Sequence, residues 1–281
     1  MQTYQITTAD GLTLHARSVG SSTTAPPVVC LHGLTRNATD FDDLANVLAP
    51  SRIVFALDFR GRGRSDYDDD WTHYVPPVYV GDVIAMLDQL EISRAIFCGT
   101  SLGGLVTMLL ARDAPERLVG AILNDIGPVI EPAGLERIQT YTGAMPSVAT
   151  WDEALAQVKS VYAASVPGLS DAQWQQMVSR SFCANDAGQP VLAFDQNIGR
   201  AIRELDMQLG DPWSLFAALD AIPTLVLRGA MSDILSEATV DAMQARHPNL
   251  QRATIAQRGH APLLNEPDSV AAIQNFIGAL T

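Results

Sequence analysis

The chain alternates between short apolar runs and longer segments in which apolar residues recur every three or four positions. Residues 4–8 and 12–17 alternate between polar and apolar side chains on either side of Asp10-Gly11, a pattern that predicts a β-hairpin. The runs at 27–31 and 52–57 are continuously apolar. Such runs are typical of central parallel strands that are covered on both faces.

Segments with helical spacing separate the apolar runs. Helices are predicted at 41–48, 78–90, 102–112, 236–245 and at the C-terminus, and further strands at 94–98, 118–123, 223–228 and 251–255. Strands that alternate with helices imply a mostly parallel sheet with right-handed crossovers.

The alternation of predicted strands and helices stops after residue 128. Helical patterns at 135–142, 151–164 and 171–182 follow one another without a clear buried strand. Loops of such length are rarely structureless, so the sequence predicts a helical cap at 129–210, inserted after the sixth strand. Residues 1–128 and 211–281 then form the core domain. The large apolar side chains of the cap either line a substrate pocket or, more commonly, form the cap's own core: Tyr141, Met145, Trp151, Tyr162, Trp174, Met177 and Phe182.

Composition narrows the classes of partner and compartment. The chain has 281 residues, 47% of them hydrophobic, and a formal net charge of −13, which disfavours nucleic acids and anionic membranes as partners. No window is long and apolar enough to predict a transmembrane helix, and the N-terminus lacks the pattern of a signal peptide. Three cysteines, an odd number, favour a reducing cytoplasm.

The stretch Gly99-Thr100-Ser101-Leu102-Gly103 carries the strongest chemical signal. It lies between a predicted buried strand and a predicted helix, which is the setting of a nucleophile elbow. The flanking glycines leave room for strand and helix to approach, and the serine hydroxyl projects from the sheet. Ser101 is therefore the predicted nucleophile.

A second loop, His32-Gly33-Leu34, follows another predicted strand. Its glycine permits a sharp turn that directs the next backbone N–H toward the pocket. The N–H groups of Leu34 and Leu102 are thus predicted to form an oxyanion hole. The His32 imidazole itself is expected to have a structural role, packing the loop.

A serine nucleophile needs a base, and the base needs an orienting acid. His260 lies between the last strand and the last helix, at the sheet edge where Ser101 emerges, and is the predicted base. Asp233 and Asp125 each follow a predicted strand at the same edge. The sequence favours Asp233 as the acid and leaves Asp125 as the alternative.

Taken together, these motifs resemble the α/β-hydrolase fold over the whole chain. The matching positions are His32-Gly33, the turn Asp58-x-Arg60-Gly61-x-Gly63-x-Ser65, the Ser101 elbow, Asp233 and Gly259-His260. The resemblance implies a Ser101–Asp233–His260 triad, with Leu34 and Leu102 as oxyanion donors. Serine at the elbow distinguishes the chain from the haloalkane dehalogenases and epoxide hydrolases of this fold, which have aspartate there.

The resulting expectation is a hydrolase that cleaves a small or medium-sized, largely apolar carboxylic ester or lactone through an acyl-enzyme. Neither a cofactor nor a metal ion is implied, because no cluster of His and Cys residues has the spacing of a metal site. Amide or C–C bond hydrolysis remains the alternative within the enzyme class. A ligand receptor without turnover, built on the same fold, is the alternative outside it.

Overall fold

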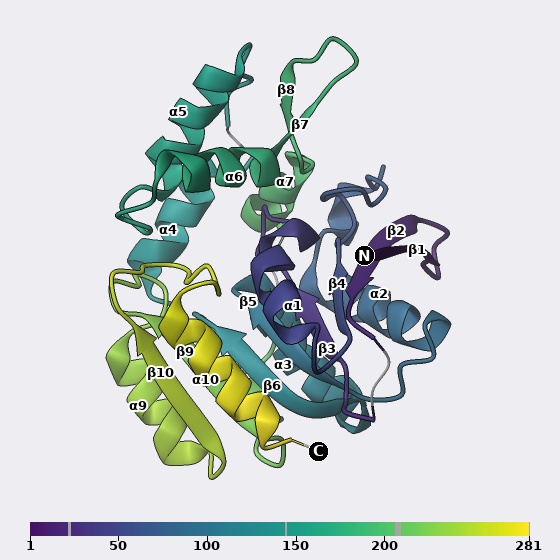
Figure 1. The fold of residues 1–281 in the computed structure, drawn as a ribbon, viewed down its shortest axis with the longest axis vertical. Coiled ribbons are helices and arrows are strands. Elements are labelled where there is room, and N and C mark those ends of the chain that lie inside the picture. Colours follow the sequence, from purple (N-terminus) through teal and green to yellow (C-terminus); the bar gives the residue numbers. More distant parts are fainter. Residues whose placement is uncertain (22–23, 144, 206–208, 281) are drawn as a thin grey trace.

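An eight-stranded sheet forms the centre of the computed structural model, which describes residues 1–21, 24–143, 145–205 and 209–280 (Figure 1). Across the sheet the strands follow the order β1 (Gln2–Thr7), β2 (Thr13–Val19), β4 (Val54–Leu57), β3 (Val28–Leu31), β5 (Ala95–Thr100), β6 (Leu118–Asn124), β9 (Thr224–Gly229) and β10 (Leu250–Ile255). Strands β1 and β2 pair antiparallel, as do β2 and β4, while the pairs from β4 to β10 are parallel. The predicted mostly parallel sheet is therefore confirmed.

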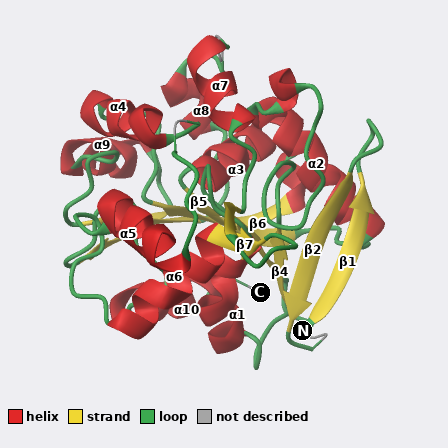
Figure 2. Cartoon of the chain, turned by 90° about the horizontal axis from the view of Figure 1, so that it is seen from above, coloured by secondary structure: helices red, strands yellow, loops and turns green. Residues whose placement is uncertain are grey.

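Helices cover both faces of this sheet, because alternate side chains of each strand point to opposite sides. In β3, Val29 and Leu31 contribute to one apolar cluster, whereas Val28 and Cys30 contribute to the other. Figure 2 shows α1 (Asp42–Leu48) and α10 (Pro267–Gly278) on one side of the sheet, and α2 (Pro76–Gln89) and α3 (Leu102–Asp113) on the other. Helix α9 (Glu237–Arg246) packs against β10.

Helix α3 lies unusually close to the strands beside it. A Cβ atom at Gly103 would overlap the backbone carbonyl of Leu31 in β3, and one at Gly99 would overlap the backbone of Gly103. Any side chain at these two positions would push the helix away from the sheet. Glycine at positions 99 and 103 therefore allows the turn between β5 and α3 to lie close against the sheet.

The segment between β6 and β9 extends beyond one end of the sheet (Figure 1), except for its last helix, which packs against α3. Its elements are α4 (Pro132–Tyr141), α5 (Trp151–Tyr162), α6 (Asp171–Ser181), β7 (Phe182–Ala184), β8 (Pro190–Leu192), α7 (Asn197–Glu204) and α8 (Pro212–Ala217). Helix α6 begins at a capping box between Ser170 and Gln173. The sequence predicts no strand in this segment, but β7 and β8 pair as a short antiparallel hairpin. Three-residue strands are too short for a period-two pattern to emerge from the surrounding sequence.

Different parts of the inserted segment pack into different apolar clusters. Helices α5 and α6 have an apolar cluster of their own, which includes Trp174, Met177 and Phe182. Phe194 and Ile198, in contrast, belong to the same cluster as the side chains of α2 and α3. The later part of the insertion therefore packs into the main core.

None of the helices within the described ranges combines the length and the apolar character that crossing a membrane requires.

Replacing Gly103 with alanine is expected to lower the free energy of unfolding by about 1–3 kcal/mol, because the added Cβ forces α3 away from β3. Gly81 is the matched control. It is an exposed helical glycine in α2, and no atom lies within 4 Å of the place that a Cβ would take, so Gly81→Ala should add about 0.5–1 kcal/mol. Urea unfolding of both variants checks the pair. Equal effects on stability would contradict the packing argument.

Candidate active site

Ser101 occupies the sharp turn between β5 and α3. Its backbone has φ +51° and ψ −112°, a conformation that side chains other than glycine rarely adopt. The Ser101 N–H donates to the Asn124 carbonyl at 3.0 Å, which ties the turn to the end of β6. The predicted elbow thus has the strained geometry that presents a serine hydroxyl above a sheet.

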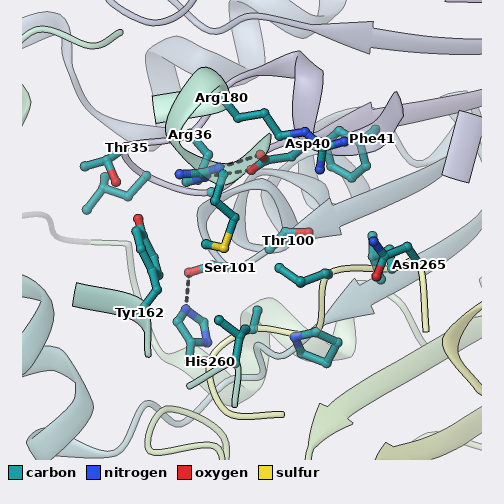
Figure 3. A pocket seen from close by; sticks show the side chains of 18 of the residues that line it. Thr35, Arg36, Asp40, Phe41, Thr100, Ser101, Tyr162, Arg180, His260 and Asn265 are labelled. Carbon is teal, nitrogen blue, oxygen red and sulfur yellow. Dashed lines mark hydrogen bonds and ion pairs between the residues drawn. The ribbon is translucent and has the colours of Figure 1, made fainter. Parts of the chain in front are cut away.

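His260 lies in the loop between β10 and α10 and connects Ser101 to an acid. Its Nε2 is 2.8 Å from Ser101 Oγ, and Figure 3 marks this contact with a dashed line. Its Nδ1 is 2.7 Å from Asp125 Oδ2. This is the geometry in which Nδ1–H donates to a carboxylate and Nε2 accepts the hydrogen of a serine hydroxyl.

Asp125 follows β6 directly and has no exposed surface. Besides His260, it accepts hydrogen bonds from the Gly229 N–H at 2.7 Å and from the Ser232 hydroxyl at 2.6 Å. These three donors fix the orientation of the carboxylate and compensate for its burial.

Asp233, which the sequence favours as the partner of His260, is bonded elsewhere. Its two carboxylate oxygens accept hydrogen bonds from Nε and Nη2 of Arg137 on α4, at 2.5 and 2.9 Å. These bonds lower the pKa of the Asp233 carboxyl group, while burial opposes the effect. The structure corrects the expectation: Asp125, not Asp233, contacts His260.

The reason lies in the loop after β9. Ser232 reaches Asp125 and donates to its carboxylate, so the next residue, Asp233, faces Arg137 in the inserted segment. Sequence position places both aspartates at one edge of the sheet but does not say which way each loop turns. No signal in the sequence singles out Ser232 or Arg137.

The loop His32-Gly33-Leu34 lies beside Ser101, since a Cβ at Gly33 would be 3.8 Å from the Cβ of Ser101. The His32 imidazole is fully buried; its Nδ1 is 2.7 Å from the Gly33 carbonyl oxygen, and its Nε2 accepts the Phe59 N–H at 3.0 Å. Burial lowers the pKa of His32 to about 4. The side chain is therefore neutral near pH 7, with its hydrogen on Nδ1.

Two backbone N–H groups beside Ser101 have no acceptor in the part of the chain that the structure describes. They belong to Leu34 and to Leu102, the first residue of α3. The amide of Leu102 is also at the positive end of the helix dipole. An oxygen that gains negative charge next to Ser101 would find both donors unoccupied.

A cavity of about 100 Å³ lies between Ser101 and the inserted segment. The apolar part of its wall is formed by Val166, Leu169 and Met177. Polar groups in the wall come from Tyr162 and Gln176. In the view of Figure 3, Arg36 and Asp40 lie beyond Ser101 from His260, whereas Tyr162 lies beside Ser101 and His260. Of the seven large side chains expected either to line a pocket or to form the cap core, Tyr141, Tyr162 and Met177 line this cavity.

The positive charge of Arg36, which borders the cavity, is balanced by an ion pair with Asp40. Its Nε and Nη2 donate to the two carboxylate oxygens of Asp40 at 2.8 and 2.7 Å, and Nη1 donates to Ser181 at the end of α6. The guanidinium lies 5.5 Å from the centre of the Tyr162 ring. Arg36 thus holds the inserted segment against the core loop.

Asp10, Asp68 and His73 are close enough together to ligate a metal ion. However, Nη1 of Arg60 lies 2.7 Å from a carboxylate oxygen of both Asp10 and Asp68. A guanidinium already supplies the positive charge there, so a cation would have to displace it.

Comparisons with known proteins identify the family of the fold. Residues 28–273 match the model of the Alpha/beta hydrolase family. The 3-hydroxybutyrate-oligomer hydrolase of Cupriavidus necator is 34% identical over 90% of this chain and 88% of its own length. Esterase YbfF of Escherichia coli is 25% identical over 95% of this chain and 98% of its own. Among solved structures, an alpha/beta hydrolase from Novosphingobium aromaticivorans has a TM-score of 0.92 and 41% identity, covering 99% of this chain and 98% of that one.

Proposed function

The chain belongs to the alpha/beta hydrolase family, and we propose that it is a serine hydrolase that cleaves a small carboxylic ester or lactone through an acyl-enzyme. The hydrogen-bonded chain from Asp125 through His260 to Ser101 carries the proposal, with contacts of 2.7 and 2.8 Å. Relatives named as an esterase and as an oligomer hydrolase support ester cleavage.

In the first half of the reaction, Ser101 Oγ attacks the ester carbonyl as its proton passes to His260 Nε2. Asp125 holds the imidazole in the tautomer that accepts this proton, and its charge stabilises the imidazolium that forms. The carbonyl oxygen becomes an oxyanion, bound by the N–H groups of Leu34 and Leu102. His260 then protonates the leaving alcohol as the C–O bond breaks.

In the second half, water replaces the alcohol. His260 Nε2 takes a proton from the water, whose oxygen attacks the acyl carbonyl and forms a second oxyanion in the same site. Collapse of this intermediate returns the proton to Ser101 Oγ and releases the carboxylic acid. No step needs a cofactor or a metal ion.

We further propose that the acyl group is short and carries a polar substituent, as in a hydroxyacid ester. The cavity beside Ser101 is small, about 100 Å³, and its wall mixes apolar side chains with Tyr162 and Gln176. The name of the Cupriavidus necator relative, a hydrolase of 3-hydroxybutyrate oligomers, fits this class of substrate.

Replacement of Ser101 with alanine should abolish ester turnover, by about 10⁶-fold where the serine acts as the nucleophile. The variant should melt like the wild type, because the hydroxyl bonds only to His260 among the described residues. Steady-state hydrolysis of p-nitrophenyl butyrate by rigorously purified protein provides the measurement. Retention of more than a few per cent of wild-type activity would refute the role of Ser101.

Substitutions at the two aspartates separate their roles. Asp125→Asn should reduce kcat by up to about 10⁴-fold, because it disturbs the tautomer and orientation of the base. Asp233→Asn is the matched control, removing the same charge four residues beyond β9, and should change kcat only a few-fold. Its cost in stability should stay below about 1 kcal/mol, since the ion pair with Arg137 is about one-third exposed.

Both aspartate variants should be assayed with the same saturating ester and with a thermal melt. A nearly normal Asp125→Asn beside a severely impaired Asp233→Asn would return the acid role to Asp233 and contradict the proposed mechanism.

A substrate panel tests the proposed acyl group. The linear dimer of 3-hydroxybutyrate and p-nitrophenyl butyrate should have higher kcat/KM than p-nitrophenyl decanoate, because a long acyl chain exceeds the cavity. The anilide of butyric acid should be cleaved far more slowly than the ester. Preference for decanoate would refute the substrate class, preferred anilide cleavage would indicate an amide hydrolase, and binding without turnover would indicate a receptor.

A further inference from the structure

Leu34, whose N–H is a proposed oxyanion donor, lies between two peptide groups. The first joins Gly33 to Leu34 and contains that N–H. Because a peptide group is planar and trans, its C=O and N–H point in opposite directions, so whatever holds the Gly33 carbonyl also aims the Leu34 N–H. His32 Nδ1 donates to this carbonyl at 2.7 Å, and the Arg36 N–H donates to it at 3.2 Å.

The direction of the His32 bond follows from its other nitrogen. Nε2 accepts the Phe59 N–H at 3.0 Å, so the single hydrogen of the neutral imidazole is on Nδ1 and is donated to Gly33. Glycine at position 33 has few steric limits on its backbone angles. Without the His32 bond, the peptide between Gly33 and Leu34 would rotate more freely.

The second peptide group, between Leu34 and Thr35, is held by Arg62. Its Nε donates to the Leu34 carbonyl at 2.9 Å. The guanidinium has no exposed surface, lies 4.8 Å from the centre of the Tyr79 ring, and donates through Nη1 to the Arg60 carbonyl and to the Tyr79 hydroxyl.

Arg62 is also an unusual buried charge. Within the described ranges no carboxylate lies within ion-pair distance of it, and its Nη2 has no hydrogen-bond partner. Burial of a cation without a counter-ion is costly. Because Arg62 donates to the Leu34 carbonyl, this costly buried cation lies against the loop beside the nucleophile.

We propose that His32 and Arg62 are positioning residues for the oxyanion hole, fixing the peptide groups on either side of Leu34 so that its N–H faces the Ser101 pocket before substrate binds. The inference rests on the proposed serine hydrolase function. It gives a role to the imidazole of the His32-Gly33 motif and to one arginine of the turn that begins at Asp58. Rotation of the first peptide group would replace a donor with a carbonyl oxygen and repel the oxyanion.

Two substitutions at position 32 separate positioning from packing. In His32→Asn, the amide nitrogen takes the place of Nδ1 and retains the donor to Gly33, but the Phe59 N–H loses its acceptor. In His32→Gln, the amide oxygen takes the place of Nε2 and retains the acceptor for Phe59, but the Gly33 carbonyl keeps only the Arg36 N–H as a donor. Each variant removes one of the two hydrogen bonds of the buried imidazole, so both should lose stability. His32→Asn, which leaves the Phe59 N–H without its acceptor, should lose at least as much as His32→Gln.

Only His32→Gln should impair the oxyanion hole. Loss of one oxyanion donor costs about 10²–10³ in kcat, so misplacing the Leu34 N–H should lower kcat about 10- to 100-fold. KM should change little, and His32→Asn should retain a kcat at least tenfold above that of His32→Gln. A trifluoromethyl ketone, which forms an oxyanion on addition of Ser101, should lose affinity for His32→Gln in proportion to the loss of kcat.

Equal kcat values for the two variants, or losses that follow their melting temperatures, would overturn the inference while leaving the hydrolase function intact. Absence of ester turnover by the wild type would overturn both. Should His32→Gln fail to fold, Arg62→Lys provides the same test. It retains the buried charge but not the planar Nε donor, and is expected to lose kcat and trifluoromethyl ketone affinity together; unchanged affinity would refute the role of Arg62.

Discussion

The close contact of helix α3 with strands β3 and β5 is the constraint on which the site depends. No side chain fits at Gly99 or Gly103, because a Cβ at either would overlap backbone atoms. The helix can therefore approach the sheet, and the chain between them must turn within a residue or two. That turn gives Ser101 its strained backbone, places its hydroxyl opposite His260, and leaves the N–H of Leu102 at the helix start without a partner among the described residues.

Much of this arrangement could be predicted from the sequence, because it depends on local patterns. Continuous apolar runs identify the central strands, and Gly99 and Gly103 identify the elbow. His260 is recognisable since it follows the last strand, and strands of a parallel sheet end at a common edge. The acid could not be predicted in the same way. Asp125 and Asp233 follow neighbouring strands, and the choice depends on the Ser232 hydroxyl and on Arg137, which is 96 residues from Asp233 along the chain.

The two aspartates differ in their contacts because their surroundings differ. Asp125 has no exposed surface and receives three hydrogen bonds, one of them from His260. Asp233 is partly exposed and is paired with Arg137 on helix α4, so it ties the inserted segment to the core. The same segment supplies part of the cavity wall through Tyr162 and Met177. Its attachment and the choice of acid are therefore linked through the loop that follows β9.

The central claim, that Ser101 is the residue acylated through His260 and Asp125, is tested most directly by identifying the labelled residue. The protein is treated with one equivalent of a p-nitrophenyl phosphonate, digested and analysed by mass spectrometry. We expect one phosphonyl group per chain, on Ser101, formed rapidly by the wild type and slowly by Asp125→Asn. Slow labelling of the wild type, or labelling at another residue, would contradict the claim.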